Sequence, residues 1–295
     1  MLDARARARF VRNRAAVAGA AVVAALVLFA LVGPALARHD AYTSDFAHGV
    51  SPTGMPVGPS ADFPLGADRI FRDVFARLAA AGRLSLLIAV ASTAIATVIG
   101  AAVGIVAGYY EGERAPRLGR LRIDVDGLLM RAVDVMLAFP FLLLVMAIGA
   151  ALEKTTAVTI FVVLGVTGWL GIARVLRSKT MQVRALDYVV ASRALGQPAW
   201  RIMLAHVLPN VAGTLVVLAT VQVAQMIVAD SILSYLGVGI SPPTPTWGGM
   251  LFDGQGYISG APWLVAGPGM AIVLAVWGFN MLGEGLRDAL DPHET

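Results

Sequence analysis

Cysteine is missing from this 295-residue sequence, which excludes disulfide bonds, thiolate metal ligands and thiol catalysis. Lysine is scarce as well: Lys154 follows Glu153 and Lys179 follows Ser178, so the sequence has no Gly-Lys-Ser/Thr phosphate-binding loop. The histidines form no His-Glu-x-x-His zinc motif, and no Gly-x-Ser-x-Gly nucleophile motif occurs. The sequence therefore indicates no enzyme and no metal site, and if ATP drives this protein another chain must bind it.

Charged side chains are few. They make up 14% of the sequence, against about 25% in an average soluble domain. Hydrophobic residues make up 58%, and the mean hydropathy is +0.75, values typical of a membrane protein. The net charge of +4 and the pI near 9.8 would also suit nucleic-acid binding. In a multi-span chain the better explanation is the excess of Lys and Arg in cytoplasmic segments, so we expect membrane lipid and no nucleic acid as a partner.

The long apolar runs predict an all-α membrane protein with six transmembrane helices and both termini in the cytoplasm. The first run is too long for a cleaved signal peptide. The predicted spans are residues 15–32, 84–108, 135–152, 155–173, 211–232 and 264–282. The chain thus divides into a basic arm with the first helix (1–36), an external segment (37–81) and a transmembrane domain (82–291). This topology places every strongly basic segment on one face.

The external segment is predicted to contain a loop and a helix. Residues 39–66 carry four prolines, which remove backbone donors and disfavour helix. Residues 69–78 follow, with apolar side chains on one helical face and Arg69, Asp73 and Arg77 on the other. This pattern predicts a helix that lies in the membrane interface. The alternative is that these residues extend the second span. Residues 235–263 are predicted to form another external loop.

Two features of the spans concern helix packing. Gly100, Gly104 and Gly108 recur every four residues in the second span, forming a stripe on which another helix backbone can approach closely. The contact is either static packing or a moving interface. Pro140 lies near the start of the third span and is expected to bend it.

Polar side chains inside the spans are rare. An ion-coupled transporter would be expected to carry ionisable groups in mid-membrane, but Asp134, Asp230 and Glu284 all fall near span ends. Gln222 and Gln225 form a polar pair inside the fifth span. Either they line a translocation path or they hydrogen-bond a neighbouring helix.

Residues 174–210, which we call the basic loop, separate the fourth and fifth spans. The loop has one acid, Asp187, and six cations, namely Arg174, Arg177, Lys179, Arg184, Arg193 and Arg201. Its pattern predicts two short helices at a sharp angle. Tyr188, Ala191 and Leu195 share a face of the first helix, and Trp200, Met203, Leu204 and Val207 share a face of the second.

Glycine and proline residues mark where the two predicted helices end and begin. Gly196 suits the left-handed position that ends the first helix, Pro198 suits the first position of the second, and Pro209 is expected to end the second. Ala191 and Ser192 leave the turn bare, so a groove on a partner can close around it. The alternative, an ordinary basic loop on anionic lipid, requires none of these residues that end or begin helices.

Several motifs resemble those of a known family. Residues 187–196 read D-Y-V-V-A-S-R-A-L-G, and residues 207–210 read V-L-P-N; together they resemble the "EAA" loop of bacterial ABC importer permeases. Further segments are similar to the second permease type of the dipeptide/oligopeptide (peptide/nickel) transport family, namely residues 63–77, 131–140, 230–239, 245–251 and 279–292. The sequence departs from the family pattern at Val190, usually Glu, at Ser192, usually Ala, at Ala67, usually Thr, and at Phe71, usually Gly.

The resemblance implies a type I ABC importer permease fold in the bacterial inner membrane, with short peptides as cargo. It also implies partners: a sister permease in a heterodimer, two ATPase subunits or one fused ATPase that bind ATP and Mg, and an external substrate-binding protein. An importer of nickel, heme or another small solute is the alternative within the family. A secondary transporter is the alternative from another class.

The resemblance also implies which residues couple the permease to its ATPase. Ala191, Ser192 and Gly196 are expected at the docking turn, and Tyr188, Leu195 and Pro209 are expected to support it. Asp187 and Arg193 belong to the same motif.

Overall fold

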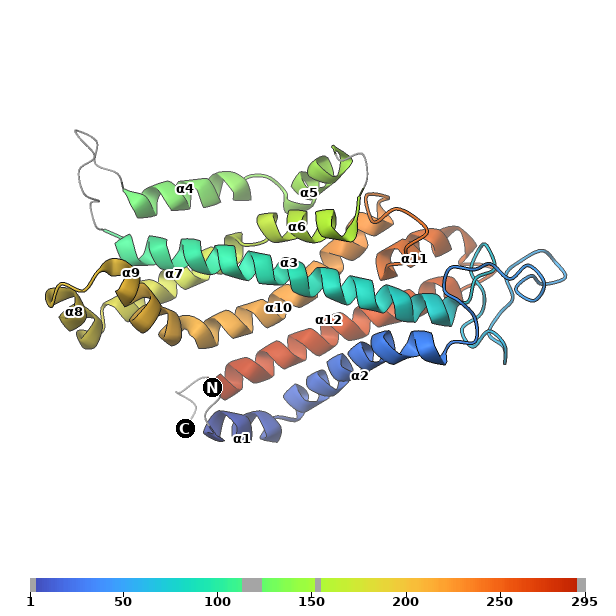
Figure 1. Ribbon diagram of the computed structural model, residues 1–295, viewed down its shortest axis with the longest axis horizontal. Helices are drawn as coiled ribbons and strands as arrows, with labels where there is room; N and C mark the ends of the chain where they lie inside the picture. Colours follow the sequence, from blue (N-terminus) through green and yellow to red (C-terminus); the bar gives the residue numbers. More distant parts are fainter. Residues whose placement is uncertain (1–3, 113–123, 152–154, 291–295) are drawn as a thin grey trace.

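The computed structural model describes residues 4–112, 124–151 and 155–290, which are largely helical and form no β-strand (Figure 1). Within these ranges, five helical segments are long and apolar enough to cross a membrane, namely Arg14–Leu36, Val74–Tyr110, Ala157–Arg184, Ala199–Tyr235 and Trp263–Leu290. A sixth span results if α4 (Val125–Leu137) and α5 (Phe141–Ala150), which meet at a bend of 78°, count as one. The predicted all-α, multi-span fold is confirmed.

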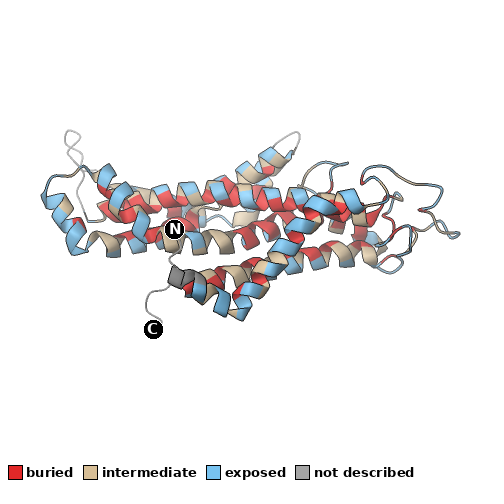
Figure 2. Ribbon diagram, turned by 60° about the horizontal axis from the view of Figure 1, so that its bottom comes forward, coloured by how far each residue is buried: buried red, intermediate tan, exposed pale blue. Residues whose placement is uncertain are grey.

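The long helices run lengthwise through the molecule (Figure 1). Helix α1 (Ala4–Arg12), α8 (Asp187–Ala194) and the end of α12 (Trp263–Leu290) lie toward one end. Residues 37–73 and α11 (Trp247–Gly254) lie at the other. We call these the loop end and the cap end. Buried residues line the faces along which helices meet, whereas the outward faces are exposed (Figure 2).

Helix α2 (Arg14–Leu36) is held to α3 (Val74–Tyr110) by an arginine that compensates for a proline. Pro34 lies inside α2 and has no N–H to donate to the carbonyl of Ala30. From α3, Arg83 donates from Nε to the Ala30 oxygen at 2.7 Å and from Nη2 to the Leu31 oxygen at 2.5 Å. A neighbouring helix thus satisfies the carbonyl freed by Pro34, as helices in a membrane require.

The glycine stripe of α3 packs directly on α7 (Leu170–Arg184). A β-carbon added at Gly104 would lie 2.5 Å from the carbonyl oxygen of Ala173, and one at Gly100 would lie 2.9 Å from that of Trp169. One at Gly108 would clash with the carbonyl oxygen of Arg177. The predicted close approach of another helix backbone is confirmed, and α7 is that helix.

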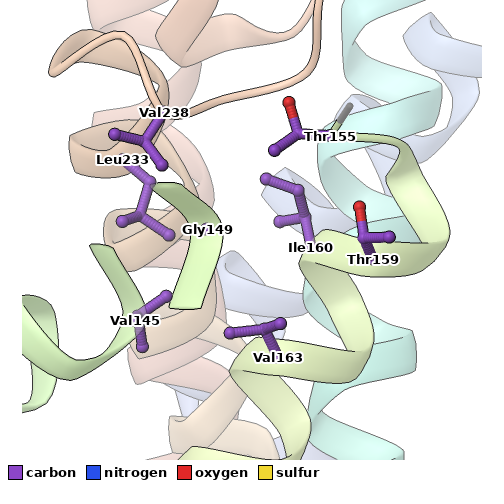
Figure 3. A pocket seen from close by; sticks show the side chains of 8 residues that line it. All are labelled: Val145, Gly149, Thr155, Thr159, Ile160, Val163, Leu233 and Val238. Carbon is purple, nitrogen blue, oxygen red and sulfur yellow. The ribbon is translucent and has the colours of Figure 1, made fainter. Parts of the chain in front are cut away.

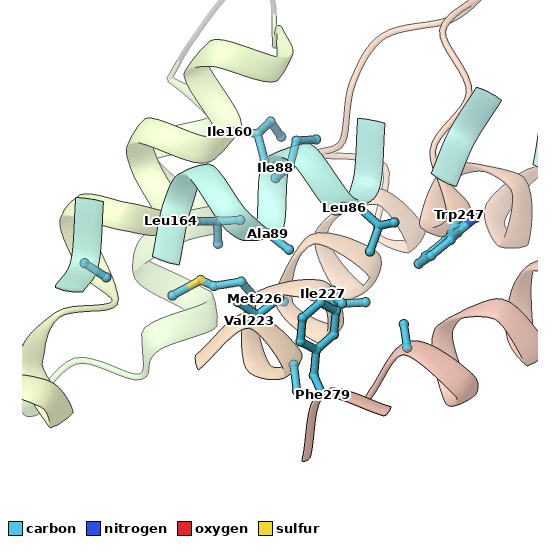
Figure 4. Close-up of a cluster of buried hydrophobic side chains, with 14 of the residues drawn as sticks. Leu86, Ile88, Ala89, Ile160, Leu164, Val223, Met226, Ile227, Trp247 and Phe279 are labelled. Carbon is cyan, nitrogen blue, oxygen red and sulfur yellow. The ribbon is translucent and has the colours of Figure 1, made fainter. Parts of the chain in front are cut away.

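The core continues from this pair to α10 (Leu208–Tyr235) and α11, with Leu164, Met226, Ile227 and Trp247 fully buried (Figure 4). Trp247 attaches α11 to α3: its indole N–H donates to the carbonyl of Leu78 at 3.3 Å, and its backbone N–H donates to Ser85 Oγ at 3.2 Å. Residues 235–263, predicted to be a loop, therefore contain a docked helix.

The separate interfacial helix predicted for residues 69–78 is wrong. Residues 67–73 form turns, and α3 begins only at Val74, where the Asp73 carboxylate caps it by accepting from the backbone N–H of Phe75 at 2.8 Å. The alternative, extension of the second span, holds from Val74 onward. Phe71 has φ +66°, a left-handed conformation that glycine adopts without strain. This accounts for the glycine that the resembled family usually has there.

Other boundaries also differ from the predictions. The third span begins ten residues earlier than expected, at Val125, and Pro140 marks a break between two helices rather than a gentle bend. The fourth, fifth and sixth spans extend to Arg184, Tyr235 and Leu290. Residues 153–154, which separate the predicted third and fourth spans, lie outside the described residues.

Helix α5 folds against α6 (Ala157–Thr167) and the end of α10. Their seam leaves only a small void of about 10 Å³, lined by Val145, Gly149, Ile160, Val163, Leu233 and Val238 (Figure 3). The Thr155 hydroxyl donates to the carbonyl of Gly239 beside it. The seam is tightly packed, so α5 and the residues that begin α6 are held against the cap end of α10.

Candidate functional site

Helix α7 enters the basic loop and is tied to its neighbours by arginines. Three of the six loop cations form ion pairs with α4 or with the residue that caps the C-terminus of α3: Arg174 with Asp134, Arg177 with Asp126, and Arg184 with Glu111. The Arg177 pair is bidentate, with both N–O distances at 2.6 Å. Arg184 also donates to the carbonyl of Tyr109 at 2.9 Å. These cations therefore position the loop rather than present free charge.

The first predicted helix of the loop is confirmed as α8. Asp187 is its first residue, where a negative charge suits the positive end of the helix dipole. At the other end Gly196 has φ +78°. Its N–H donates to the Arg193 carbonyl at 3.0 Å, and the N–H of Gln197 donates to the Ser192 carbonyl at 3.2 Å. This pair of bonds is a Schellman motif, so the predicted left-handed role of Gly196 is confirmed.

The second predicted helix differs from expectation. Pro198 is the N-cap of α9 (Ala199–Ile202) rather than its first residue. A short π-helix, η1 (Met203–Val207), which we call the π-turn, then leads without interruption into α10. Pro209 therefore does not end the helix but lies in the first turn of α10. The wide π-turn explains this, because it supplies the irregular backbone that a proline ring and its missing donor require.

His206, which the sequence analysis did not single out, joins α8 to the π-turn. Its Nε2 lies 3.3 Å from Ser192 Oγ, and its ring meets that of Tyr188 edge-on at 5.9 Å. Nearby, the Arg193 guanidinium lies 5.5 Å from the centre of the Tyr109 ring, a cation–π contact with α3. The H-x-L-P-N pattern of residues 206–210 was the available signal for this histidine.

The apolar faces predicted for these helices are largely uncovered. Val189, Ile202 and Val207 are buried, but Leu195 is 83% exposed; its predicted role in supporting the docking turn stays a prediction. Half or more of each of Val190, Trp200 and Leu204 is also exposed, as are large parts of Leu186 and Tyr188. Ala191 and Gly196 are exposed as well. We call this apolar surface, residues 186–204, the docking surface, because a patch of this kind marks an interaction site.

A cavity of about 470 Å³ opens between helices α4, α5, α6, α7 and α10. Its walls include Met136, Phe139, Phe141, Thr167, Gln222 and Gln225. Gln222 Nε2 also donates to the carbonyl of Gly168, the C-cap of α6, at 3.1 Å. The two predicted glutamines are therefore brought to one cavity, and Gln222 additionally makes the inter-helix bond that was the alternative.

The described residues contain no group of three or more His, Asp or Glu side chains placed to hold a metal ion. At the cap end, the backbone N–H of His48 donates to Asp45 and holds the pKa of this carboxyl below its usual value. Neither observation points to a reaction centre.

Two comparisons extend these findings. Residues 100–295 match the family described as binding-protein-dependent transport system inner membrane component, and residues 4–51 match the N-terminal transmembrane domain of oligopeptide transport permease C. The chain is 33% identical to the oligopeptide transport system permease protein OppC of Bacillus subtilis, over 96% of this chain and 87% of that protein. It is 37% identical to the dipeptide permease protein DppC of the same organism (96% and 83%) and 34% identical to the glutathione permease protein GsiD of Pectobacterium atrosepticum (96% and 89%).

Proposed function

The chain belongs to the family of binding-protein-dependent transport system inner membrane components, and from that premise we propose that it is a permease subunit of an ABC importer for short peptides. The relatives named above are permeases for oligopeptides, dipeptides and glutathione, itself a tripeptide. These names favour peptides over nickel, heme or another solute. The chain is a multi-pass protein of the bacterial inner membrane.

The observation that carries this proposal is the docking surface. Leu195 and Trp200 are 83% and 62% exposed beside the turn at Gly196, within a cluster of exposed apolar side chains of the kind that marks an interaction site. We assign the ATPase to this surface. Two ATPase subunits, or one fused ATPase, would bind ATP and Mg, and this chain would perform no catalysis itself. A sister permease in a heterodimer and an external substrate-binding protein complete the assembly.

The contacts of α8 supply a route by which ATPase movement reaches the membrane. On one side α8 follows α7, which is packed on the glycine stripe of α3 and paired with α4 through Arg177 and Asp126. On the other side it leads through the π-turn into α10. Since α4, α7 and α10 all line the central cavity, a displacement of α8 moves the cavity walls. Rocking of these helices would open the cavity alternately to each side of the membrane.

A substitution at the turn tests this coupling. Gly196→Val should lower uptake of a radiolabelled dipeptide at least tenfold at a normal membrane level, because the new side chain intrudes at the docking surface. Gly54→Val is the matched control, since Gly54 also has φ +78° and no atom near its β-carbon position, so both variants carry similar backbone strain. Its uptake should stay within twofold of wild type. Ala191→Asp should act like Gly196→Val.

Unchanged uptake in both loop variants would contradict the coupling role. Competition by unlabelled dipeptide, but not by nickel or heme, is expected if peptides are the cargo. Flux through the purified chain alone, driven by an ion gradient, would instead indicate a secondary transporter.

A further inference from the structure

We propose that a cavity at the cap end binds the headgroup of phosphatidylethanolamine, a phospholipid with a primary ammonium group, with the phosphate against Arg83 and the ammonium against Asp40. The cavity has a volume of about 380 Å³, and both residues line it. It is separate from the cavity between α4, α5, α6, α7 and α10. The proposal does not depend on which cargo the importer carries.

Three segments that are far apart in the sequence form this cavity. Its walls come from the end of α2 and the residues that follow it (34–42), from residues of α3 between 76 and 87, and from residues 244–245. The end of α2 and the start of α3 lie side by side at the cap end (Figure 1). The predicted first span ends at residue 32 and the second begins at residue 84. The cavity therefore lies at a membrane boundary, where lipid headgroups lie.

Arg83 is placed to receive the phosphate. Its Nε and Nη2 donate to the carbonyls of Ala30 and Leu31, which fixes the guanidinium in position. The described residues supply no acceptor to Nη1, and Arg83 is exposed. Arginine forms strong, charge-assisted hydrogen bonds with phosphate oxygens, and a side chain that is already ordered loses little freedom when it binds.

Asp40 is placed to receive the ammonium. Its Oδ1 accepts from the backbone N–H groups of Tyr42 at 2.6 Å and Thr43 at 3.2 Å, so the turn holds the carboxylate. Within the described part of the chain, no donor reaches Oδ2. A primary ammonium has three N–H donors for this oxygen, as a lysine side chain does, whereas the quaternary ammonium of phosphatidylcholine has none.

The charges of the cavity wall are those that a zwitterion requires. The third ionisable residue of the lining, His39, has its Nδ1 3.5 Å from Asp73 and its ring stacked on Phe63, so it is already engaged within the chain. One guanidinium and one carboxylate remain for a ligand. A headgroup with one negative and one positive charge therefore matches this wall better than an anionic headgroup does.

The apolar surface below the cavity suits acyl chains. Leu87 lies one helical turn further into the membrane than Arg83 and is 56% exposed. On α2, Leu31 and Leu28 share one helical face and are 59% and 62% exposed. The bond from Arg83 to the Leu31 carbonyl places the two surfaces next to each other. A lipid buries its chains on such a surface, which a small soluble zwitterion cannot do, and this favours a phospholipid as the occupant.

Native mass spectrometry of the assembled importer tests this site. The purified complex is titrated in detergent with dioleoyl-phosphatidylethanolamine, and separately with the matching phosphatidylcholine and phosphatidylglycerol. The wild type should bind phosphatidylethanolamine about tenfold more tightly than the other two, because only this headgroup offers both the phosphate and an N–H donor for Asp40. Equal affinity for all three lipids would overturn the proposal.

Asp40→Asn removes the charge and keeps a side-chain oxygen that can accept from Tyr42 and Thr43. The affinity for phosphatidylethanolamine should fall about tenfold, as expected when a charge-assisted hydrogen bond is lost, and the preference over phosphatidylglycerol should disappear. The control Asp62→Asn removes an exposed charge, paired with Arg38, that does not line the cavity, and it should keep the wild-type preference. A preference that survives in Asp40→Asn, or that is lost equally in Asp62→Asn, would overturn the assignment of the ammonium.

Filling the cavity is an independent test of the place. Ala80 lines the cavity and is half-buried, so Ala80→Phe should occupy the space and remove the most tightly bound phosphatidylethanolamine. Ala94→Phe adds the same ring at an exposed position of α3 outside the cavity and should leave binding unchanged. Thermal unfolding in detergent shows whether each variant is folded. Wild-type binding by a folded Ala80→Phe would overturn the site, and if that variant does not fold, Asp40→Asn decides.

Soluble competitors distinguish a lipid from a small zwitterion. Phosphoethanolamine has the charges of the headgroup and no acyl chains, so it should displace the lipid only at a concentration at least about tenfold higher, since it lacks the apolar surface to bury. The dipeptide Leu-Leu should not displace the lipid at that concentration. Displacement by Leu-Leu would indicate a second peptide site instead of a lipid site, and displacement by phosphoethanolamine at a concentration equal to that of the lipid would indicate a soluble ligand. Either result would overturn the proposal and leave the importer function untouched.

Discussion

The two ends of the molecule differ in which side chains they bury most completely and which they leave most exposed. At the cap end, Asp68, Arg72 and Arg77 are about 5% exposed or less and are paired with one another. Arg72 and Arg77 contact the same Asp68 oxygen at 2.7 and 3.3 Å. At the loop end, large apolar side chains such as Leu195 and Trp200 face outward.

The difference shows where this chain is complete by itself. Charges are buried only when partners satisfy them, and at the cap end this chain supplies those partners. Large apolar residues that cluster on a surface indicate a missing partner, and at the loop end this chain leaves them uncovered. The cap end also exposes apolar side chains, such as Phe46 (69%) and Tyr42 (50%), so the contrast lies in its buried charges, which are satisfied within the chain. We call the cap end the closed end, and the loop end, where we assign the ATPase, the open end.

The strongest test of the closed end removes its shared carboxylate. Asp68→Asn should lower the free energy of unfolding by about 3–5 kcal/mol, because two buried guanidiniums lose the carboxylate that they share and Arg72 keeps only a longer contact of 3.9 Å with Asp253. Thermal unfolding of the purified protein in detergent measures the change. The control Asp62→Asn removes the exposed pair with Arg38 and should have an effect of at most about 1 kcal/mol. Equal effects would remove the contrast between the ends.

The connection between the ends is tested at the glycine stripe. Gly104→Ala should lower the free energy of unfolding by about 1–3 kcal/mol, since the added methyl overpacks the contact with Ala173 and Leu176. The control Gly213→Ala adds the same methyl in α10, where the nearest atom is 3.8 Å away. A stable, fully active Gly104→Ala variant would show that α3 and α7 are not in tight contact.

Substitutions at the open end should weaken association with the ATPase and leave the folding stability of this chain almost unchanged. Leu195→Ser together with Trp200→Ser should weaken ATPase association about tenfold, which corresponds to about 1.4 kcal/mol. Unfolding of the isolated chain should shift by no more than about 0.5 kcal/mol, because exposed side chains lose little on truncation. A pull-down titration and a thermal melt separate the two. Loss of folding with intact association would reverse the assignment.

The smallest effect is expected from the rim of the open end. Arg174 and Asp134 are both more than half exposed, so Arg174→Gln should change stability by at most about 1 kcal/mol. Arg177→Gln should lower the free energy of unfolding more than Arg174→Gln does, because the Arg177–Asp126 pair is bidentate and largely buried. Thermal unfolding of both variants under the same conditions gives the order of the two stability losses. The opposite order would show that burial does not decide how strongly an ion pair stabilises this fold.

Features with a local physical cause could be predicted from the sequence. The spans follow from hydrophobic length alone. The turn at Gly196 follows from glycine's access to positive φ, and the α3 contact follows from glycines at every fourth position. A bend at Pro140 follows from its missing donor, although a break of 78° exceeds what was expected.

Features that depend on distant partners could not be predicted. The spacing of Arg69, Asp73 and Arg77 suggested a helix over residues 69–78. Instead Arg77 forms an ion pair with Asp68, and Asp73 is the N-cap of α3, so the helix starts only at Val74. Pro209 appeared to be a stop because nothing in the sequence announces the π-turn before it. The exposure of individual apolar side chains such as Leu195 could not be predicted either, since periodicity identifies an apolar face but not the chain that covers it.

Helix α3 is long enough to act as a lever between the two ends of the molecule. Its 37 residues correspond to a rod of about 55 Å at 1.5 Å per residue. It starts at the Asp73 cap beside the buried ion network and ends where Arg184 holds the carbonyl of Tyr109. Because α7 packs in its glycine stripe, we expect the two helices to move together. A tilt of about 10° at the loop end would move the far tip by about 10 Å, so a small displacement of α8 by the ATPase that we propose would become a larger one at the cap end.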